Sequence, residues 1–215
     1  MLITISDNDL KSIVVGIQIA AEAIMRGGIV VVGTETFYGI AANPFMDQAV
    51  EKIFSIKKRP FRSPLPLIAA DRHFVNSKVI CFSTIEETLI KNFWPGSLTI
   101  LLDGCANFSK HVSNEAGKIG VRVPTDCPAR RLAEKAGGWI TATSANLSGE
   151  PAPQKVTDIP AEITDAVDVV LDSGPCPGGL PSTIVDTSCV SWRMVRHGAI
   201  SEKSIAETLQ GFETD

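Results

Sequence analysis

Two short polar segments carry the residue types that a site for a charged ligand needs. A KKRP segment concentrates positive charge in Lys57 and Arg59, and a SANLSG segment further along supplies the Ser144 hydroxyl and the Asn146 amide. An ammonium and a forked guanidinium both suit phosphate oxygens, so the pair of segments favours a phosphorylated, polyanionic small molecule. Each segment also has a simpler interpretation. Basic residues at a helix end complement the helix macrodipole and face solvent, and a Ser/Asn turn satisfies its own backbone.

Three hydroxyl residues, Thr34, Thr36 and Tyr38, follow a predicted buried strand over residues 29–32. In an extended chain the period of two puts all three on one side and Glu35 on the other. Three hydroxyls at the end of a strand can bind a polar ligand. The alternative is an ordinary, half-exposed strand end made of good β-formers.

Isolated cations and hydroxyls recur in later strands. Arg122 stands among apolar residues in a predicted strand over residues 119–123, where its permanent charge requires an anionic partner. That partner is either a carboxylate ligand or an internal Asp or Glu. Ser182 lies where a Pro- and Gly-rich loop enters a strand, and Arg196 lies at a strand end, where exposure to solvent would also explain it.

Several common active-site signatures are absent from the sequence. There is no P-loop, no dinucleotide-binding glycine fingerprint and no Cys-x-x-Cys pair, and the three histidines are scattered. These absences make a protein-held metal and Ser-His-Asp hydrolysis weak candidates. We therefore predict no metal held by protein ligands.

Helix and strand patterns interleave along the chain and indicate the α/β class. We expect helices over residues 10–24, 49–56, 84–93, 128–136 and 201–209, and a short helix or a turn over residues 159–166. We expect strands over residues 29–32, 65–69, 98–102, 119–123, 139–142, 167–171, 183–186 and 192–195. Some neighbouring strands lack an intervening helix, which argues against a simple doubly wound sheet. The prediction is one α/β domain over residues 1–215 with a twisted mixed sheet flanked by helices.

Composition places the chain among ordinary globular proteins. Of its 215 residues, 44% are apolar and 20% are charged, and the net charge of -4 argues against a general nucleic-acid coat. The N-terminus lacks the pattern of a signal peptide, and no apolar run is long enough to cross a bilayer. The five cysteines are odd in number and widely spaced, which is typical of reduced intracellular thiols. We expect a cytoplasmic protein without membrane contact.

Taken in order, seven segments between about residues 24 and 200 resemble the YrdC/TsaC family of L-threonylcarbamoyladenylate synthases. Each segment alone is a weak signal, but all seven in this order are specific for the family. They read TETFYG, KKRP, FWPG, VRVP, SANLSG, STIVD and RHGAI. The resemblance implies one YrdC-like domain around a large basic cavity. It also implies a nucleotidyltransferase that joins L-threonine, bicarbonate and ATP into threonylcarbamoyl-AMP and releases pyrophosphate.

Matching motifs assign roles to individual residues. Threonine is expected to be held by Thr36, Arg122, Ser144 and Ser182, with Arg122 meeting its carboxylate. ATP and its phosphates are expected to meet Lys57, Arg59, Ser63, Asn146 and Arg196, of which Lys57 and Arg59 are the catalytic pair. Further candidates are Thr34, Tyr38, Lys118 and Gln154. The last two occupy positions where the family often has threonine.

The resemblance also implies partners. Mg²⁺ is expected to enter with ATP and to be held mainly by phosphate oxygens. The product would serve threonylcarbamoyladenosine modification of tRNA through a transferase complex. The alternative is a YrdC/YciO-type protein that binds double-stranded RNA or a nucleotide in its basic cavity without efficient synthesis.

Overall fold

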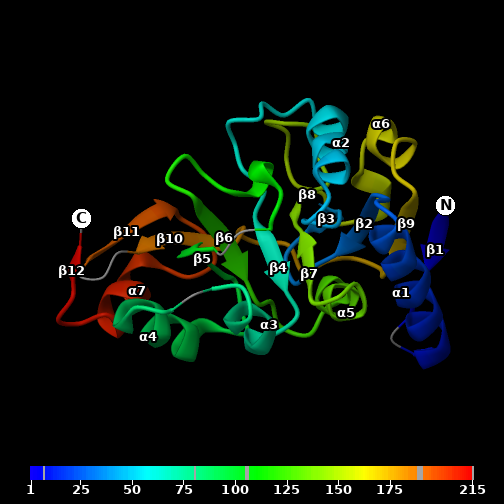
Figure 1. Ribbon diagram of the computed structural model, residues 1–215. Coiled ribbons are helices and arrows are strands. Elements are labelled where there is room, and N and C mark those ends of the chain that lie inside the picture. Colours follow the sequence, from blue (N-terminus) through cyan, green and yellow to red (C-terminus); the bar gives the residue numbers. More distant parts are fainter. Residues whose placement is uncertain (7, 80, 105–106, 188–190, 215) are drawn as a thin grey trace.

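The computed structural model arranges the strands in two mixed sheets that meet near the middle of the molecule, with helices on their faces (Figure 1). The structure describes residues 1–6, 8–79, 81–104, 107–187 and 191–214. This arrangement confirms the α/β class with flanking helices. The expected single sheet is divided in two.

The five-stranded sheet carries the first hydroxyl segment. Its order is β1 (Leu2–Thr4), β9 (Val169–Asp172), β2 (Val30–Gly33), β3 (Tyr38–Ala41), β8 (Thr143–Ser144). β1, β9 and β2 run parallel, whereas β3 is antiparallel to both β2 and β8. Val30 and Val32 pack in one hydrophobic cluster and Val31 in the other, so β2 is covered on both faces. This explains its uninterrupted apolar sequence.

The seven-stranded sheet carries Arg122. Its order is β12 (Glu213–Thr214), β11 (Ser191–Arg196), β10 (Thr183–Thr187), β5 (Leu98–Asp103), β6 (Lys118–Arg122), β4 (Leu67–Ala69), β7 (Trp139–Thr141). Ile100 pairs with Val121 in the register of β5 and β6, and both belong to the main hydrophobic cluster. Period two turns Thr99 and Arg122 to the opposite face. That face borders the candidate site.

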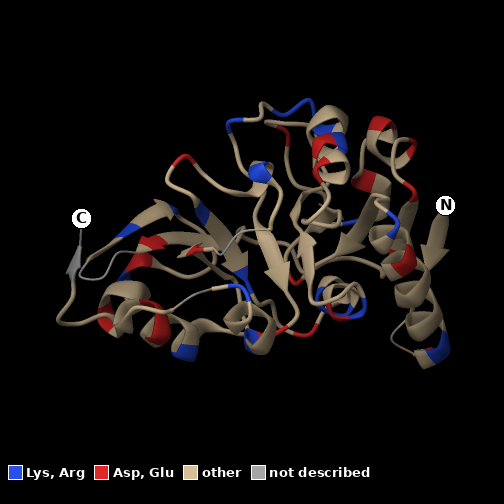
Figure 2. Ribbon diagram, in the orientation of Figure 1, with Lys and Arg blue, Asp and Glu red and all other residues tan. Residues whose placement is uncertain are grey.

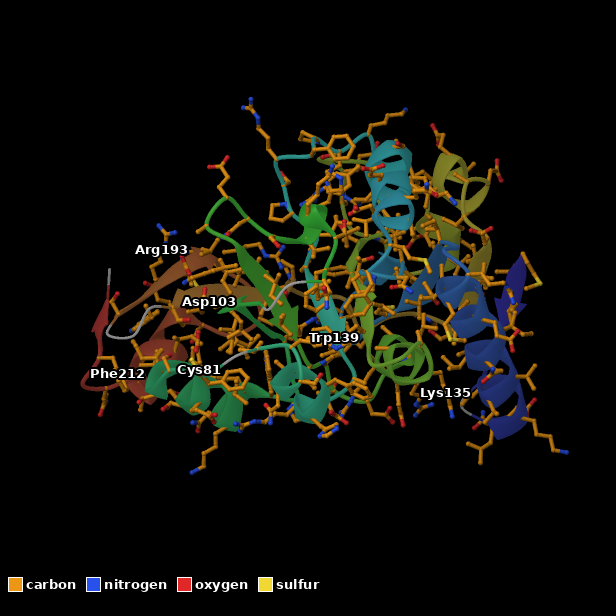
Figure 3. The ribbon with its side chains drawn as sticks, in the orientation of Figure 1. Cys81, Asp103, Lys135, Trp139, Arg193 and Phe212 are labelled. Carbon is orange, nitrogen blue, oxygen red and sulfur yellow. The ribbon has the colours of Figure 1, made fainter. Side chains whose placement is uncertain are left out.

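Helices cover the apolar faces. α1 (Leu10–Met25) and α5 (Pro128–Lys135) share one hydrophobic cluster with β2 and β9. On the other face of the five-stranded sheet lie α2 (Asp47–Lys57) and α6 (Ala161–Thr164) (Figure 1). The seven-stranded sheet is covered on one face by α3 (Arg72–Asn76), α4 (Thr84–Phe93) and α7 (Glu202–Thr208). Trp139 lies between these groups of helices in the middle of the molecule, 2% exposed (Figure 3).

Two 3₁₀ turns complete the described elements, at Lys110–Val112 and Val156–Asp158.

The end of α2 positions the basic segment. Lys58 follows the last helical residue, Lys57, and adopts a left-handed conformation with φ 51° that ends the helix. The backbone N–H of Ser148 donates to the Lys57 carbonyl at 3.1 Å, so the helix end is attached to the SANLSG loop. The Lys and Arg residues of the loop after α2 are visible in Figure 2. The two polar segments singled out in the sequence therefore meet in space.

Most expected elements are present, with boundaries shifted by a few residues. β1, β3, β8, β12 and α3 were not predicted. The expected extended conformation beyond β2 is wrong, because residues 34–37 form the turn that joins β2 to β3. In that turn Thr34 N donates to Phe37 O at 3.1 Å.

Three of the cysteines, Cys81, Cys127 and Cys176, are free thiols. Cys105 and Cys189 lie outside the described residues. Within the described ranges, no helix has the length and apolar character needed to cross a bilayer.

Candidate functional site

A cavity of about 320 Å³ opens between the two sheets. Its walls come from the β2–β3 turn and β8 on one side, and from β4, β5 and β6 on the other. Nine of the sequence-predicted site residues line it: Thr34, Thr36, Tyr38, Arg59, Arg122, Ser144, Asn146, Ser182 and Arg196. Residues far apart in the sequence thus converge on one hollow.

Thr34 and Thr36 form the hydroxyl wall. The Oγ1 atoms lie 3.1 Å apart, and Thr34 Oγ1 accepts the backbone N–H groups of Thr36 at 3.1 Å and Phe37 at 3.2 Å. These bonds make a Thr turn that fixes both hydroxyls at the cavity. Tyr38 is different, because its hydroxyl donates to Gly174 O at 2.7 Å. Burial raises the pKa of Tyr38 to about 12, so its hydroxyl remains a neutral donor that anchors a neighbouring loop.

Arg122 lies at the end of β6, with 9% of its side chain exposed. Its NH1 atom donates to Glu35 Oε1. Of the two partners left open by the sequence, the structure therefore contains the internal carboxylate. Arg122 nevertheless lines the cavity, and Glu35 is the one hydrogen-bond partner of its guanidinium among the residues that the structure describes.

Ser182, Thr99 and Arg196 form a hydrogen-bonded unit on the opposite wall. The Thr99 and Ser182 hydroxyls lie 2.9 Å apart, and Arg196 NH2 donates to Ser182 Oγ at 2.9 Å and to Ser182 O at 2.8 Å. Burial lowers the pKa of Arg196, and the positive charges of Arg122 and Arg59 lower it further. Arg122 and Arg59 are therefore each close enough to repel the Arg196 guanidinium, which favours an anionic ligand in the cavity that all three residues line.

Arg59 faces the cavity from the loop after α2. Its Nε donates to Ser63 O at 3.0 Å and its NH2 to Pro64 O at 3.4 Å. Burial lowers the pKa of Arg59. Ser63 itself does not line the cavity, so its contribution is to orient the arginine through its carbonyl.

Lys57 is placed differently from our expectation that it faces the cavity. It is 2% exposed and lies behind the SANLSG loop. Its Nζ donates to Ser144 O, to Asn146 O at 2.6 Å and to Asn146 Oδ1 at 3.2 Å. Burial lowers its pKa to about 8, and the Arg59 charge contributes. The ammonium thus uses its three donors on the loop that presents Ser144 and Asn146 to the cavity.

Ser144 and Asn146 are further fixed by bonds within their own loop. Ser144 Oγ donates to Asn146 Oδ1, and Asn146 Nδ2 donates to the carbonyl of Glu150. Glu150 also lines the cavity. The loop is therefore held in one conformation by Lys57, by its own side chains and by the end of α2.

Two further candidates lie outside the cavity. Lys118 pairs with Asp186 at 2.7 Å, and Asp186 also binds Arg193, which lies toward the C-terminal side of the molecule (Figure 3). Gln154 borders an adjoining hollow within residues 150–160, which shares Glu150 and Ala152 with the cavity. The departures from the family pattern at these two positions therefore do not alter the cavity lining.

Sequence reasoning missed Thr99 and Glu150 in the cavity lining, and it missed Glu35 as the partner of Arg122. Thr99 lies in an apolar strand and Glu150 follows a turn, and neither carries a signal of its own. Extended geometry places Glu35 on the side away from the hydroxyls; in the structure Glu35 does lie outside the cavity lining, but there it pairs with Arg122. Its position in the sequence between Thr34 and Thr36 was the one signal that could have indicated a place near the site.

The described residues contain no group of three or more His, Cys, Asp and Glu side chains that could hold a metal ion. Thr and Ser residues and Glu150 contribute possible oxygen ligands for a hard cation to the cavity lining, whereas the amide oxygen of Asn146 already accepts from Lys57 and Ser144. Such a lining suits a cation that arrives with an anionic ligand better than one held by the protein alone.

Comparisons with known proteins agree with this arrangement. The Sua5/YciO/YrdC family model, described as "Telomere recombination", matches residues 22–198. A putative threonylcarbamoyl-AMP synthase of Methanocaldococcus jannaschii is 33% identical over 88% of this chain and 89% of its own length.

Two solved structures are similar throughout. Pyrococcus abyssi Sua5 in complex with L-threonine superposes with a TM-score of 0.90 at 27% identity, over 100% of this chain. This chain spans 62% of that Sua5 chain. Escherichia coli YciO superposes with a TM-score of 0.80 at 26% identity, covering 95% of this chain and 98% of YciO. From the sequence motifs, the cavity and these matches, the chain belongs to the Sua5/YciO/YrdC family.

Proposed function

We propose that the protein is a threonylcarbamoyl-AMP synthase, a nucleotidyltransferase that uses L-threonine, bicarbonate and ATP. The observation that carries this proposal is the convergence of Arg59, Arg122 and Arg196 with hydroxyl and amide donors in one cavity. Relatives named threonylcarbamoyl-AMP synthase and the threonine complex of P. abyssi Sua5 support it.

The reaction has two steps whose demands match the cavity. The amine of threonine and bicarbonate condense to a carbamate and water. A carbamate oxygen then attacks the α-phosphorus of ATP, a new P–O bond forms, and pyrophosphate leaves with the electrons of the broken bond. Both reactants are anions, so fixed cations must hold them together and stabilise the charge on the leaving pyrophosphate. The arginine cluster meets that need without a protein nucleophile.

The arrangement of the cavity suggests how the substrates divide it. Arg122 is assigned to the threonine carboxylate, with the hydroxyls of Thr36 and Ser182 beside it. Arg59 and Arg196 are assigned to the phosphates. Ser144 is assigned to threonine and Asn146 to the nucleotide; both line the same cavity.

Mg²⁺ is assigned to the ATP phosphates, with the cavity hydroxyls and Glu150 as the nearest oxygen ligands that the protein offers. When bound, it would neutralise phosphate charge. The arginines bind and orient the remaining oxygens.

The proposal places the protein in threonylcarbamoyladenosine modification of tRNA in the cytoplasm. The carbamoyl adenylate is a mixed anhydride, so a transferase must consume it with tRNA as the acceptor. Binding of tRNA or of the transferase complex by this chain is part of the proposal.

The test is pyrophosphate release from purified protein with ATP, threonine and bicarbonate, each omitted in turn. We expect release only with all three, together with threonylcarbamoyl-AMP in the mass spectrum of the quenched mixture. Arg122→Lys is the matched variant, because lysine keeps the positive charge but lacks the forked guanidinium that can bind a carboxylate with two hydrogen bonds. Release that ignores threonine would refute the proposal.

A second candidate function is favoured by the match to E. coli YciO, which covers nearly the whole of both chains. In this case the cavity would bind RNA or a nucleotide without efficient synthesis. Double-stranded RNA binding that weakens steeply with salt, combined with no turnover, would favour this candidate. The net charge of -4 counts against it.

A further inference from the structure

Glu35 and Arg122 join the two sheets at the cavity. Glu35 belongs to the β2–β3 turn of the five-stranded sheet, and Arg122 ends β6 of the seven-stranded sheet. Their side chains are 12% and 9% exposed and form an ion pair. A buried pair loses much hydration, so it requires further hydrogen bonds to be stable.

Glu35 has such bonds on the side away from the cavity. Ser97 Oγ donates to Glu35 Oε1 at 3.3 Å, and Cys127 Sγ lies 4.0 Å from Oε2 as a weak donor. Burial raises the pKa of Cys127 to about 11 and the Glu35 charge adds to the rise, so the thiol keeps its proton. The carboxylate is thus held behind Arg122, and Glu35 is not part of the cavity lining.

The backbone of Glu35 is fixed as well. Thr34 Oγ1 accepts from the backbone N–H groups of Thr36 and Phe37, the two residues after Glu35, and the Thr34 N–H donates to Phe37 O. The carboxylate therefore approaches Arg122 from a preorganised turn.

Arg122 has N–H donors that remain unused. A guanidinium carries five, and Glu35 is its one hydrogen-bond partner among the residues that the structure describes. Glu35 uses only the NH1 atom of Arg122, and Arg122 lines the cavity whereas Glu35 does not, so the remaining donors can serve a ligand there. One planar carboxylate can use two of them together.

We propose that Glu35 is a positioning residue for threonine: it holds Arg122 by one edge so that the other edge binds the amino-acid carboxylate. It also cancels one of the three positive charges that Arg59, Arg122 and Arg196 bring together. This inference rests on the proposed function for the identity of the ligand.

The opposite role would be competition, in which Glu35 occupies the place of the substrate carboxylate. The placement of Glu35 argues against this, because its carboxylate lies with Ser97 and Cys127 outside the lining. The two roles predict opposite effects of neutralising Glu35.

The experiment is threonine binding by titration calorimetry, with ATP binding measured in parallel. Losing a charge-assisted hydrogen bond weakens binding about tenfold or more. We expect Glu35→Gln to raise the Kd for threonine by about that factor and to leave the Kd for ATP within about threefold. In a protein that already carries Arg122→Lys, Glu35→Gln should raise the Kd for threonine by less than about threefold, because Glu35 acts through Arg122. Glu87→Gln removes a surface ion pair with Arg72 and serves as the matched control with unchanged binding.

Several results would overturn the proposal: unchanged or tighter threonine binding by Glu35→Gln, equal losses for threonine and ATP, or full additivity with Arg122→Lys. If Glu35→Gln does not fold, Ser97→Ala removes one bond to the same carboxylate. A threonine Kd unchanged in that variant would also overturn the proposal. Because binding is measured without turnover, threonine binding combined with absent pyrophosphate release would reject the proposed function and leave this inference to be judged separately.

Discussion

Replacing Lys57 with methionine tests whether this lysine supports the SANLSG loop or faces the ligand. The change removes a buried ammonium and its hydrogen bonds to Ser144 O, Asn146 O and Asn146 Oδ1. Methionine has a similar length and leaves little empty volume. The loop acceptors then lose their donors inside the protein.

The magnitude follows from two opposing terms. Each hydrogen bond to a charged donor contributes about 1.5–3 kcal/mol. The lowered pKa of Lys57, about 8 against 10.5, shows that keeping the buried ammonium charged costs about 3 kcal/mol at neutral pH. Methionine removes this cost but also removes three hydrogen bonds that together contribute more. The free energy of unfolding should therefore fall by about 2–6 kcal/mol.

The assay is thermal and urea unfolding at pH 7, with turnover measured beside it. For a chain of this length the expected loss lowers Tm by at least about 4 °C. Arg59→Met is the matched control, since it removes a neighbouring cation that lines the cavity. It should abolish turnover and keep Tm within about 2 °C. If Lys57→Met loses turnover at unchanged Tm, the ammonium contacts the substrates and the loop-support argument is wrong.

Three further predictions follow from the same structure. Because the pKa of Lys57 is lowered from 10.5 to about 8, the unfolded chain binds more protons between these values, so this group makes the free energy of unfolding rise with pH across that window. Cys127 and Cys176, whose pKa values burial raises to about 11, oppose this trend in both proteins. In urea unfolding from pH 7 to 10, the free energy of unfolding of the wild type relative to Lys57→Met should therefore rise with pH; a difference that is constant with pH would contradict this. Thr99→Val breaks the hydroxyl pair with Ser182 and should raise the threonine KM about threefold to tenfold, with an unchanged KM as the contrary result. Lys118→Ala should leave both substrate KM values within about twofold, because Lys118 is bonded to Asp186 and neither residue lines the cavity.

The sequence predicts the long elements well because their apolar residues follow one clear period. α1 is an example: residues 10–24 were expected, Leu10–Met25 form the helix, and Asp9 caps it by accepting from Lys11 N and Ser12 N. β3 was missed because TETFYG has the alternation of one continuous strand. Only the Thr34 hydroxyl bonds, which close a turn, show where that strand breaks.

The candidate site was predictable as a set of residues and only partly as an arrangement. Chemistry and motif order selected Arg59, Arg122 and Asn146, which share the cavity. They did not reveal that Lys57 points behind the loop, because the direction of a helix-end side chain depends on what packs against it. The Glu35 partnership depends on how the two sheets meet, a property of tertiary packing that no local pattern encodes.

The construction of the cavity wall has a consequence for dissecting the protein. Its lining begins at Thr34 and extends to Arg196, with contributions from both sheets in between. No contiguous fragment that stops short of either residue retains the complete wall. A proteolytic cut or truncation within that span should therefore abolish recognition of both substrates together, and the binding capacity cannot be transplanted as a short peptide motif.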